Sequence, residues 1–224
     1  MLCAATPELT GYAISHQHMP FDLFLVRHGT TDWNEDGRLL GRTDVPLNAR
    51  GHAEAEATAE ALRPFPLRAI VASPQRRTRE TAAAVARWHG LTVVEEPGLA
   101  EVWVKESWQG KPWQELQHEP DIQRYLEDPL YRCEVIEPAS AIQERTVAAV
   151  ERLRECSEGP VLVISHGDPI KLLLTHYLAM ELPAYRRLAV SPASVSVVRF
   201  DQDHDKRLLM LNWRAPGTLE RLLD

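Results

Sequence analysis

The stretch that most constrains this fold is an apolar run at residues 23–30, Leu-Phe-Leu-Val-Arg-His-Gly-Thr. A run rich in branched and aromatic residues and closed by glycine predicts a buried β-strand. Open α/β sheets bind ligands in the crevice beyond the carboxyl ends of their strands. Arg27 and His28 stand at that end, so they offer a cation and an imidazole to a ligand. Taken alone, the triplet Arg-His-Gly is better explained as the polar end of a strand.

Segments typical of helices and strands then alternate along the chain. Helices are predicted over residues 49–63, 75–88, 139–156 and 170–180, and strands over 69–72, 92–95, 161–164, 195–200 and 207–213. This order implies right-handed crossovers between parallel strands. We therefore expect an α/β fold of three layers, with a mostly parallel central sheet and helices on both faces. The polar segment 31–37 is expected to be a loop.

The strand at 161–164 is the most apolar in the chain and predicts a central strand. It ends in Ser165-His166-Gly167, much as the first strand ends in Arg-His-Gly. Asp168 is then the expected N-cap of a helix and Pro169 its first residue. The free N–H groups of that helix would favour an anion beside His166. If the two strands are neighbours, both imidazoles project into one crevice.

Two kinds of site compete for such a pair of histidines. A metal would need a third ligand near by, commonly a carboxylate or another histidine. A phosphoryl group would instead need arginines, because a guanidinium binds phosphate bidentately and stays charged. Arg27 is adjacent to His28, and Arg76, Arg77 and Arg79 crowd the start of the helix after Ser73-Pro74. Cations repel a metal ion, so the arginines favour phosphate chemistry.

The chain now resembles the histidine phosphatase superfamily, which includes the cofactor-dependent phosphoglycerate mutases. The resemblance rests on five blocks in order: Leu25-Val26-Arg27-His28-Gly29, Asn34, Ser73-Pro74 with the arginine cluster and Thr81-Ala82, Leu99-Ala100-Glu101, and Ser165-His166-Gly167. It covers roughly residues 21–200. Each block alone is weak, but their joint occurrence is highly specific. The resemblance implies a phosphoglycerate mutase-like fold and an enzyme without a metal or organic cofactor.

The resemblance also implies roles for five residues. His28 resembles the nucleophile that takes up the phosphoryl group as a phosphohistidine, which requires an unprotonated ring nitrogen. Arg27, Arg77 and His166 resemble the pocket that holds the phosphoryl oxygens and stabilises charge in the transition state. Glu101 resembles the proton donor to the leaving oxygen and later the base that activates water.

Other residues match the family with less distinct roles. Arg77 is chosen within its cluster because it falls four residues after Ser73, and Arg79 is the alternative. Asn34 resembles a substrate or phosphate contact. Gly41 and Gly167 are expected to offer backbone N–H groups to the substrate.

Departures from the family's mutases favour a phosphatase. The mutases carry a tyrosine three residues after the acid, where this chain has Val104. They also carry a long insert with further basic residues, whereas Lys105 and Lys111 are the only lysines in this shorter interval. Two alternatives stay open: phosphoglycerate mutase-type transfer, and a catalytically silent module that binds phosphorylated ligands. Both histidines, Arg27 and Glu101 argue against the silent module, since binding needs neither nucleophile nor proton donor.

The interval from residue 97 to residue 138 has poor periodicity and holds Trp103, Trp108 and Trp113. Such a segment is typical of an excursion over the sheet that shapes a pocket. The alternative is that these tryptophans only anchor the surface. An aromatic pocket wall would predict a small phosphomonoester substrate with an apolar or ring-bearing part.

Composition sets the remaining expectations. The 224 residues suit one domain over 21–213, preceded by a flexible extension at 1–20 and followed by a tail at 214–224. A net charge of −7 disfavours nucleic-acid binding. Three widely spaced cysteines suit the cytoplasm, and no apolar run is long enough to span a membrane. A homodimer is the expected assembly, on general frequency alone.

Overall fold

A computed structural model describes residues 21–128, 130–201 and 205–215. Its strands are β1 (Phe21–Arg27), β2 (Ala69–Ala72), β3 (Val93–Glu95), β4 (Val161–Ser165), β5 (Val195–Phe200) and β6 (Lys206–Trp213). Its α-helices are α1 (Asp32–Glu35), α2 (Ala49–Leu62), α3 (Arg76–His89), α4 (Trp113–Leu116), α5 (Pro120–Glu127), α6 (Ala139–Cys156) and α7 (Gly167–Tyr177). Short 3₁₀ turns are η1 (Pro97–Leu99), η2 (Glu106–Trp108) and η3 (Leu182–Arg187). The predicted extension at 1–20 lies outside the described residues.

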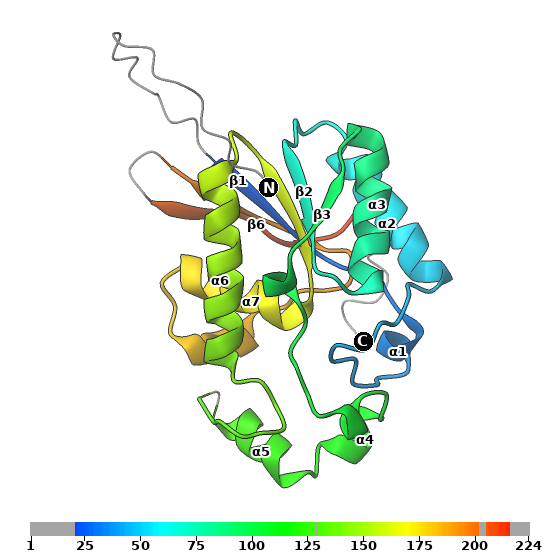
Figure 1. Cartoon of the computed structure of the whole chain (residues 1–224), viewed down its shortest axis with the longest axis vertical. Helices are drawn as coiled ribbons and strands as arrows, with labels where there is room; N and C mark the ends of the chain where they lie inside the picture. Colours follow the sequence, from blue (N-terminus) through cyan, green and yellow to red (C-terminus); the bar gives the residue numbers. More distant parts are fainter. Residues whose placement is uncertain (1–20, 129, 202–204, 216–224) are drawn as a thin grey trace.

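The strands form one six-stranded sheet in the order β3-β2-β4-β1-β5-β6. β3, β2, β4 and β1 run parallel, whereas β5 and β6 join antiparallel at one edge. The strands that carry the two histidines are therefore neighbours, with Arg27 opposite Ser165 in the register. This confirms the three-layer α/β prediction, with the antiparallel pair as its mixed part (Figure 1).

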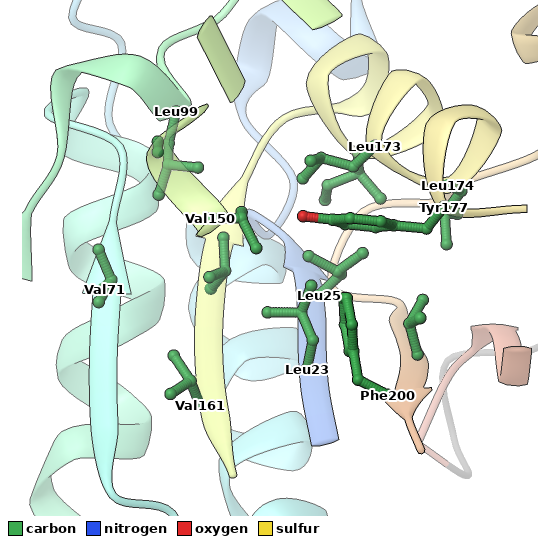
Figure 2. Close-up of a cluster of buried hydrophobic side chains, with 14 of the residues drawn as sticks. Leu23, Leu25, Val71, Leu99, Val150, Val161, Leu173, Leu174, Tyr177 and Phe200 are labelled. Atoms are coloured by element: carbon green, nitrogen blue, oxygen red, sulfur yellow. The ribbon is translucent and has the colours of Figure 1, made fainter. Parts of the chain in front are cut away.

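Helices cover both faces of the sheet because alternate side chains of the central strands point to opposite faces. Leu23 and Leu25 of β1 pack with residues of α6 and α7 (Figure 2), whereas Phe24 and Val26 pack with residues of α2 and α3. Both cores are nearly closed to solvent, which explains why β1 and β4 read as continuous apolar runs rather than as alternating ones.

Two local predictions were wrong. Residues 31–37 do not form only a loop: Thr31 caps the short helix α1 in a capping box, in which Thr31 Oγ1 accepts from the Asn34 N–H and Asn34 Oδ1 accepts from the Thr31 N–H. Helix α7 begins at Gly167 with His166 as its N-cap, so Asp168 and Pro169 are its second and third residues. The proline misled the prediction because the first-turn N–H groups of a helix have no partner, so a proline is tolerated throughout that turn.

The interval 97–138 contains short helices instead of a regular layer. α4 and α5 lie beyond the carboxyl end of the sheet, α4 near α1 and α5 below α6 (Figure 1). They form a third apolar cluster of their own, in which Trp108 is fully buried and Leu172 of α7 takes part. The segment 97–138 is thus packed against the main domain and covers the carboxyl end of the sheet.

Arg214 packs with the described domain. Its guanidinium Nη2 lies 3.1 Å from Glu54 Oε1 on α2, and both side chains are buried.

Over the described ranges, none of the helices combines the length and the apolar character needed to cross a bilayer.

Candidate active site

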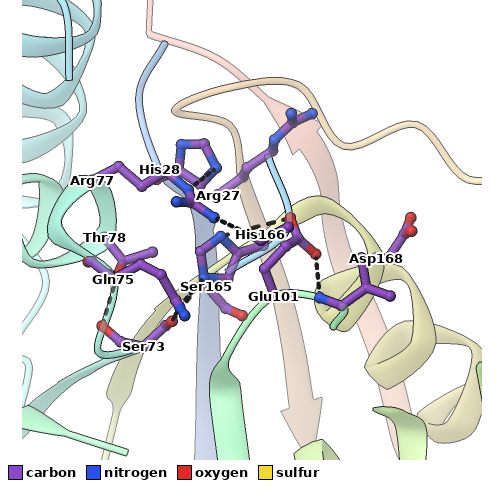
Figure 3. A network of polar contacts seen from close by, with 12 residues as sticks. Arg27, His28, Ser73, Gln75, Arg77, Thr78, Glu101, Ser165, His166 and Asp168 are labelled. Atoms are coloured by element: carbon purple, nitrogen blue, oxygen red, sulfur yellow. Dashed lines mark hydrogen bonds and ion pairs between the residues drawn. The ribbon is translucent and has the colours of Figure 1, made fainter. Parts of the chain in front are cut away.

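His28 follows β1 directly and is fully buried. Its Nδ1 lies 2.7 Å from the carbonyl oxygen of Gly29, so this nitrogen carries the proton and donates. The other nitrogen, Nε2, then has a free lone pair, and Arg77 Nε donates to it at 3.3 Å. Figure 3 shows the two side chains facing each other at the centre of the site. The backbone carbonyl thus fixes the tautomer that a nucleophile at Nε2 requires.

The electrostatic surroundings keep His28 neutral. Burial lowers its pKa well below the ordinary value, and the positive charges of Arg77 and Arg27 lower it further. The hydrogen bond to Gly29 opposes this shift but does not reverse it. An unprotonated imidazole therefore persists to acidic pH, because adding a proton would place a third positive charge in a buried site.

His166 follows β4, and its ring centroid lies 5.1 Å from that of His28. Its Nε2 lies 2.9 Å from Gln75 Oε1 and 2.7 Å from Ser73 Oγ. The amide oxygen of Gln75 accepts, so the proton is on Nε2. The opposite nitrogen, Nδ1, has no hydrogen-bond partner among the described residues and lies 3.7 Å from Glu101 Oε2.

The two arginines are held by backbone carbonyls. Arg77 donates through Nη1 to Thr43 O at 2.8 Å and through Nη2 to Gly41 O at 3.0 Å. Arg27 donates through Nη1 to Val190 O at 2.8 Å, while its buried Nε lacks a partner in the described part of the chain. Burial lowers the pKa of Arg77 to about 10, so the guanidinium stays charged at neutral pH.

Arg79, the alternative within the arginine cluster, lies elsewhere. Its guanidinium is 3.7 Å from Asp44 and 3.5 Å from Glu95, at the exposed surface. One turn of α3 places Arg77 on the buried face and Arg79 on the solvent face. The structure therefore brings Arg77, and not Arg79, against His28.

Glu101 stands on the loop that follows η1, beside both histidines (Figure 3). Burial raises the pKa of its carboxyl group, and the negative charge of Asp168 raises it further. Its loop is fixed because Ser165 Oγ donates to Leu99 O at 2.7 Å and Arg145 donates to Glu101 O at 3.2 Å. A carboxyl group with a raised pKa is suited to donate a proton near neutral pH.

His28, Glu101 and His166 also form a set that could hold a metal ion. One ligand atom from each residue lies within 4.8 Å of the others. However, a divalent cation would meet the positive charges of Arg27 and Arg77, so the surroundings fit an anion better.

A cavity of about 280 Å³ opens onto this cluster. The expected binding residues Asn34, Gly41 and Gly167 all line it, together with Arg27 and Glu101. Asn34 also holds the capping box of α1, and the Gly41 carbonyl accepts from Arg77, a contact that the sequence did not suggest. The backbone N–H roles expected for Gly41 and Gly167 stay predictions.

The three tryptophans of the interval 97–138 differ in position and burial. Trp113 lines the active-site cavity, and Trp108 is fully buried behind it against the adjoining cavity. Trp103 is 39% exposed and lines neither of these two cavities. The interpretation of an aromatic wall thus holds for Trp108 and Trp113 and is wrong for Trp103, whose exposed side chain lies away from both.

Sequence reasoning missed the groups that hold the site. Ser73 and Gln75 hold His166; the sequence marks Ser73 only as part of the Ser73-Pro74 block, and the signal for Gln75 is no more than its position just after β2. Glu54 of α2 accepts from the N–H and the hydroxyl of Thr30, two residues after His28. Buried glutamate amid helical alanines is the signal, but it is visible only once the buried face of α2 is known.

Comparisons with known proteins agree with this geometry. Residues 23–214 match the model of the histidine phosphatase superfamily (branch 1). An acid phosphatase of Mycobacterium tuberculosis is 31% identical over 183 residues, covering 80% of this chain and 86% of that protein. The "probable phosphoglycerate mutase GpmB" of Enterobacter sp. (strain 638) is 29% identical over 188 residues, covering 80% of this chain and 85% of that protein.

A solved structure also matches. The mycobacterial glucosyl-3-phosphoglycerate phosphatase in complex with VO3 is 26% identical, with a TM-score of 0.78 over 87% of this chain and 99% of that one. The family resemblance seen in the sequence is therefore confirmed. This chain belongs to the histidine phosphatase superfamily, branch 1.

Proposed function

We propose that this protein hydrolyses phosphate monoesters of a small molecule through a phosphohistidine on His28. The observation that carries the proposal is the tautomer of His28: Nδ1 donates to Gly29 O, and the free Nε2 faces Arg77. A binding module needs no such nitrogen, whereas a nucleophile does. The names of the acid phosphatase and glucosyl-3-phosphoglycerate phosphatase relatives support the same reaction class.

In the first step, the lone pair on His28 Nε2 attacks phosphorus and the ester P–O bond breaks. The leaving oxygen takes a proton from Glu101, whose pKa is raised by burial, which favours its protonated form. Arg27, Arg77 and His166 would bind the phosphoryl oxygens. The unpartnered Arg27 Nε is a donor that an oxyanion would satisfy, whereas His166 Nδ1 can donate only when His166 takes up a proton, which the negative charge of a bound phosphoryl group favours.

In the second step, ionised Glu101 takes a proton from water, and the resulting hydroxide oxygen bonds to phosphorus. The P–N bond breaks, inorganic phosphate leaves, and His28 regains its free lone pair. Glu101 ends protonated, so the cycle is balanced. Acid and base roles alternate on one carboxyl group, as microscopic reversibility requires.

A phosphatase is favoured over a mutase by two contacts. Val104 is buried and pairs with Ile136, so the position of the mutase tyrosine is filled by an apolar core residue. Lys105 Nζ lies 3.9 Å from the ring centroid of Trp108, which commits this lysine to a cation–π contact. Mutase-type transfer nevertheless stays the alternative, and the GpmB relative is the observation in its favour.

Further parts of the proposal come from the sequence. The reaction is expected to be metal-independent and to take place in the cytoplasm, where free cysteines such as Cys133 and Cys156 are stable. A single domain over 21–213 and a homodimer are also expected.

The test is hydrolysis of p-nitrophenyl phosphate in the presence of EDTA. His28→Ala is expected to lower kcat/KM by at least about 10³-fold, because it removes the nucleophile. His52→Ala is the matched control, since His52 is exposed on α2 outside the site. An acid-labile phosphoprotein should also form in the wild type and not in His28→Ala. Turnover that survives the loss of His28, or a wild type without turnover, would contradict the proposal.

A further inference from the structure

A second cavity adjoins the active-site cavity. Its volume is about 350 Å³, within the range of pockets that hold small molecules. Five residues line both cavities: Leu39, Val102, Trp113, Asp168 and Lys171. The second cavity is thus continuous with the cavity that Arg27 and Glu101 line, so it lies within reach of the part of a substrate beyond its phosphoryl group.

The second cavity is apolar over most of its wall. The wall includes Val104, Trp108 and Ile136 from the irregular interval 97–138, and Ile122 and Leu126 from α5 within it. These residues belong to the third apolar cluster or lie at its surface, so the wall is held by the fold rather than by a loop.

Two tyrosines complete the wall without adding an open polar group. The hydroxyls of Tyr125 and Tyr185 lie 3.3 Å apart and bond to each other. Burial and the neighbouring Tyr185 raise the pKa of Tyr125, so this phenol stays neutral near pH 7. Their rings therefore present apolar surface to the cavity.

The cations of the wall are already engaged. Lys171 Nζ lies 3.2 Å from Asp168 Oδ1 at the junction of the two cavities. The guanidinium of Arg186 keeps its charge, but it donates to the carbonyls of Leu126 and Tyr125. An anionic group in this cavity would meet Asp168 and would lose its hydration among apolar side chains, and Arg186 could offset that cost only by giving up these hydrogen bonds.

We propose that this cavity binds the leaving group, and that the preferred substrates are phosphate monoesters of neutral aromatic alcohols, aryl or arylalkyl. The inference rests on the proposed hydrolysis at His28 and names its substrate class. Trp113 forms the shared wall, Trp108 the buried floor, and the tyrosine pair the far side. Hydrophilic monoesters that carry carboxylates are expected to be poorer substrates, since the apolar wall gives little in exchange for the hydration that they lose and the cations Lys171 and Arg186 already have partners.

Substrates of matched leaving-group reactivity test this preference. 3-Phenylpropyl phosphate, glycerol 1-phosphate and O-phosphoserine all release a primary alcohol, so chemistry alone does not rank them. The phenylpropyl ester is expected to have a kcat/KM at least about tenfold higher than the other two, because burial of several apolar carbons is worth that much. Equal values, or higher values for phosphoserine, would overturn the inference.

Two pairs of variants locate the effect. Leu126→Asp places a carboxylate in the second cavity only, and Leu130→Asp places one at an exposed position of the same segment outside it. Trp113→Ala removes the shared wall, and Trp103→Ala removes a tryptophan of similar exposure that lines neither cavity. Leu126→Asp and Trp113→Ala should each lower kcat/KM for the phenylpropyl ester about tenfold, with their controls unchanged. Leu126→Asp should leave glycerol 1-phosphate turnover as it is.

A binding measurement separates this inference from the proposed function. His28→Ala cannot turn over by the proposed route, so the Kd of each ester can be measured calorimetrically on it. Tighter binding of the phenylpropyl ester, lost in His28→Ala/Leu126→Asp, supports the cavity even if no hydrolysis is found. Hydrolysis that depends on His28, combined with equal Kd values for all three esters, would uphold the proposed function and overturn the cavity assignment.

Discussion

At the scale of single residues, burial moves two ionisable groups in opposite directions. It lowers the pKa of His28, because a buried imidazole resists its positive charge, and raises that of Glu101, because a buried carboxyl resists its negative charge. Both shifts act in the same sense: they favour an unprotonated imidazole beside a protonated carboxyl group. Pairs of groups with pKa values pushed apart are typical of acid–base catalysis.

This arrangement predicts how Glu101→Gln behaves with different leaving groups. An alkyl oxygen must be protonated as it leaves, so we expect kcat/KM for an alkyl phosphate to fall about 10²-fold or more. p-Nitrophenolate leaves without a proton, so its ester should lose far less. Steady-state kinetics with both substrates check this. An equal loss with both esters would contradict the assignment of Glu101 as the proton donor.

The same variant has a distinctive pH profile. In the wild type, kcat/KM for an alkyl phosphate should fall as pH rises through the raised pKa of Glu101, because the ionised form cannot donate. The acidic limb should come only at low pH, where His28 finally takes a proton. Glu101→Gln should lose the fall on the alkaline side that belongs to Glu101. Glu106→Gln, at an exposed position of η2, is the matched control.

Sequence reasoning could predict the residues that perform chemistry but not those that hold them. His28, Arg27 and His166 follow apolar strands, so their placement at the strand ends follows from the pattern itself. Gln75 fixes the proton of His166, yet it is one polar residue among many at a helix start. Such contacts depend on which strands are neighbours, and that is set by tertiary packing.

At the scale of elements, the site depends on a close approach between α2 and the chain after β1. A Cβ atom on Gly51 would lie 2.0 Å from the backbone oxygen of Thr30, and one on Gly29 would lie 2.5 Å from the Gly51 oxygen. Asn48, the N-cap of α2, accepts from the Gly51 N–H and donates its own N–H to Thr30 O. Two glycines thus let the helix start pack directly on the loop that carries His28.

Gly51→Ala is a test in which two effects have opposite signs. Helix propensity alone would stabilise the protein by about 1 kcal/mol, since Gly51 lies inside α2. The clash with Thr30 backbone has no flexible partner that can yield, and overpacking of this kind costs about 1–3 kcal/mol or more. We expect the clash to exceed the propensity gain, so the free energy of unfolding falls and kcat falls with it.

Urea unfolding measures this balance. Ala53→Gly, at an exposed position of the same helix, calibrates the propensity difference and should cost about 1 kcal/mol without changing kcat. A Gly51→Ala protein as stable as the wild type would show that the loop after His28 is not held by this contact.

The predictability of the elements follows their environment. The first and last residues of β2, α6 and β5 are those predicted from the sequence, because continuous apolar runs or long amphipathic patterns define these elements. The interval 97–138 resisted prediction, since α4 and α5 are short and their stability comes from packing into the third apolar cluster. Local periodicity carries little information where tertiary contacts decide.

At the scale of the whole molecule, the fold places two arginines at one locus within a protein of net negative charge. The net charge is −7, yet Arg27 and Arg77 lie beside two neutral histidines. This suits a small anionic substrate and not a long polyanion, because the positive charge lies inside a cavity. The arrangement also makes stability depend on pH.

The free energy of unfolding should fall as pH decreases below about 6.5. The pKa values of His28 and His166 are lowered in the folded state, so the unfolded chain binds more protons below the ordinary histidine pKa of 6.5. Each histidine then removes up to about 1.4 kcal/mol per pH unit until pH reaches its folded pKa. Glu101 acts with the opposite sign, because its raised pKa makes the folded state bind the extra proton.

Urea unfolding of the wild type and of His28→Asn/His166→Asn, at pH 7.5, 6.5 and 5.5, isolates the histidine contribution. The double variant lacks both lowered groups and keeps Glu101, so its stability should fall less on acidification than that of the wild type. Inorganic phosphate should flatten the wild-type curve, because its negative charge favours protonated histidine. Parallel curves for the two proteins would mean that folding does not lower the pKa values of these two imidazoles. The argument that His28 is a neutral nucleophile with a fixed tautomer would then fail.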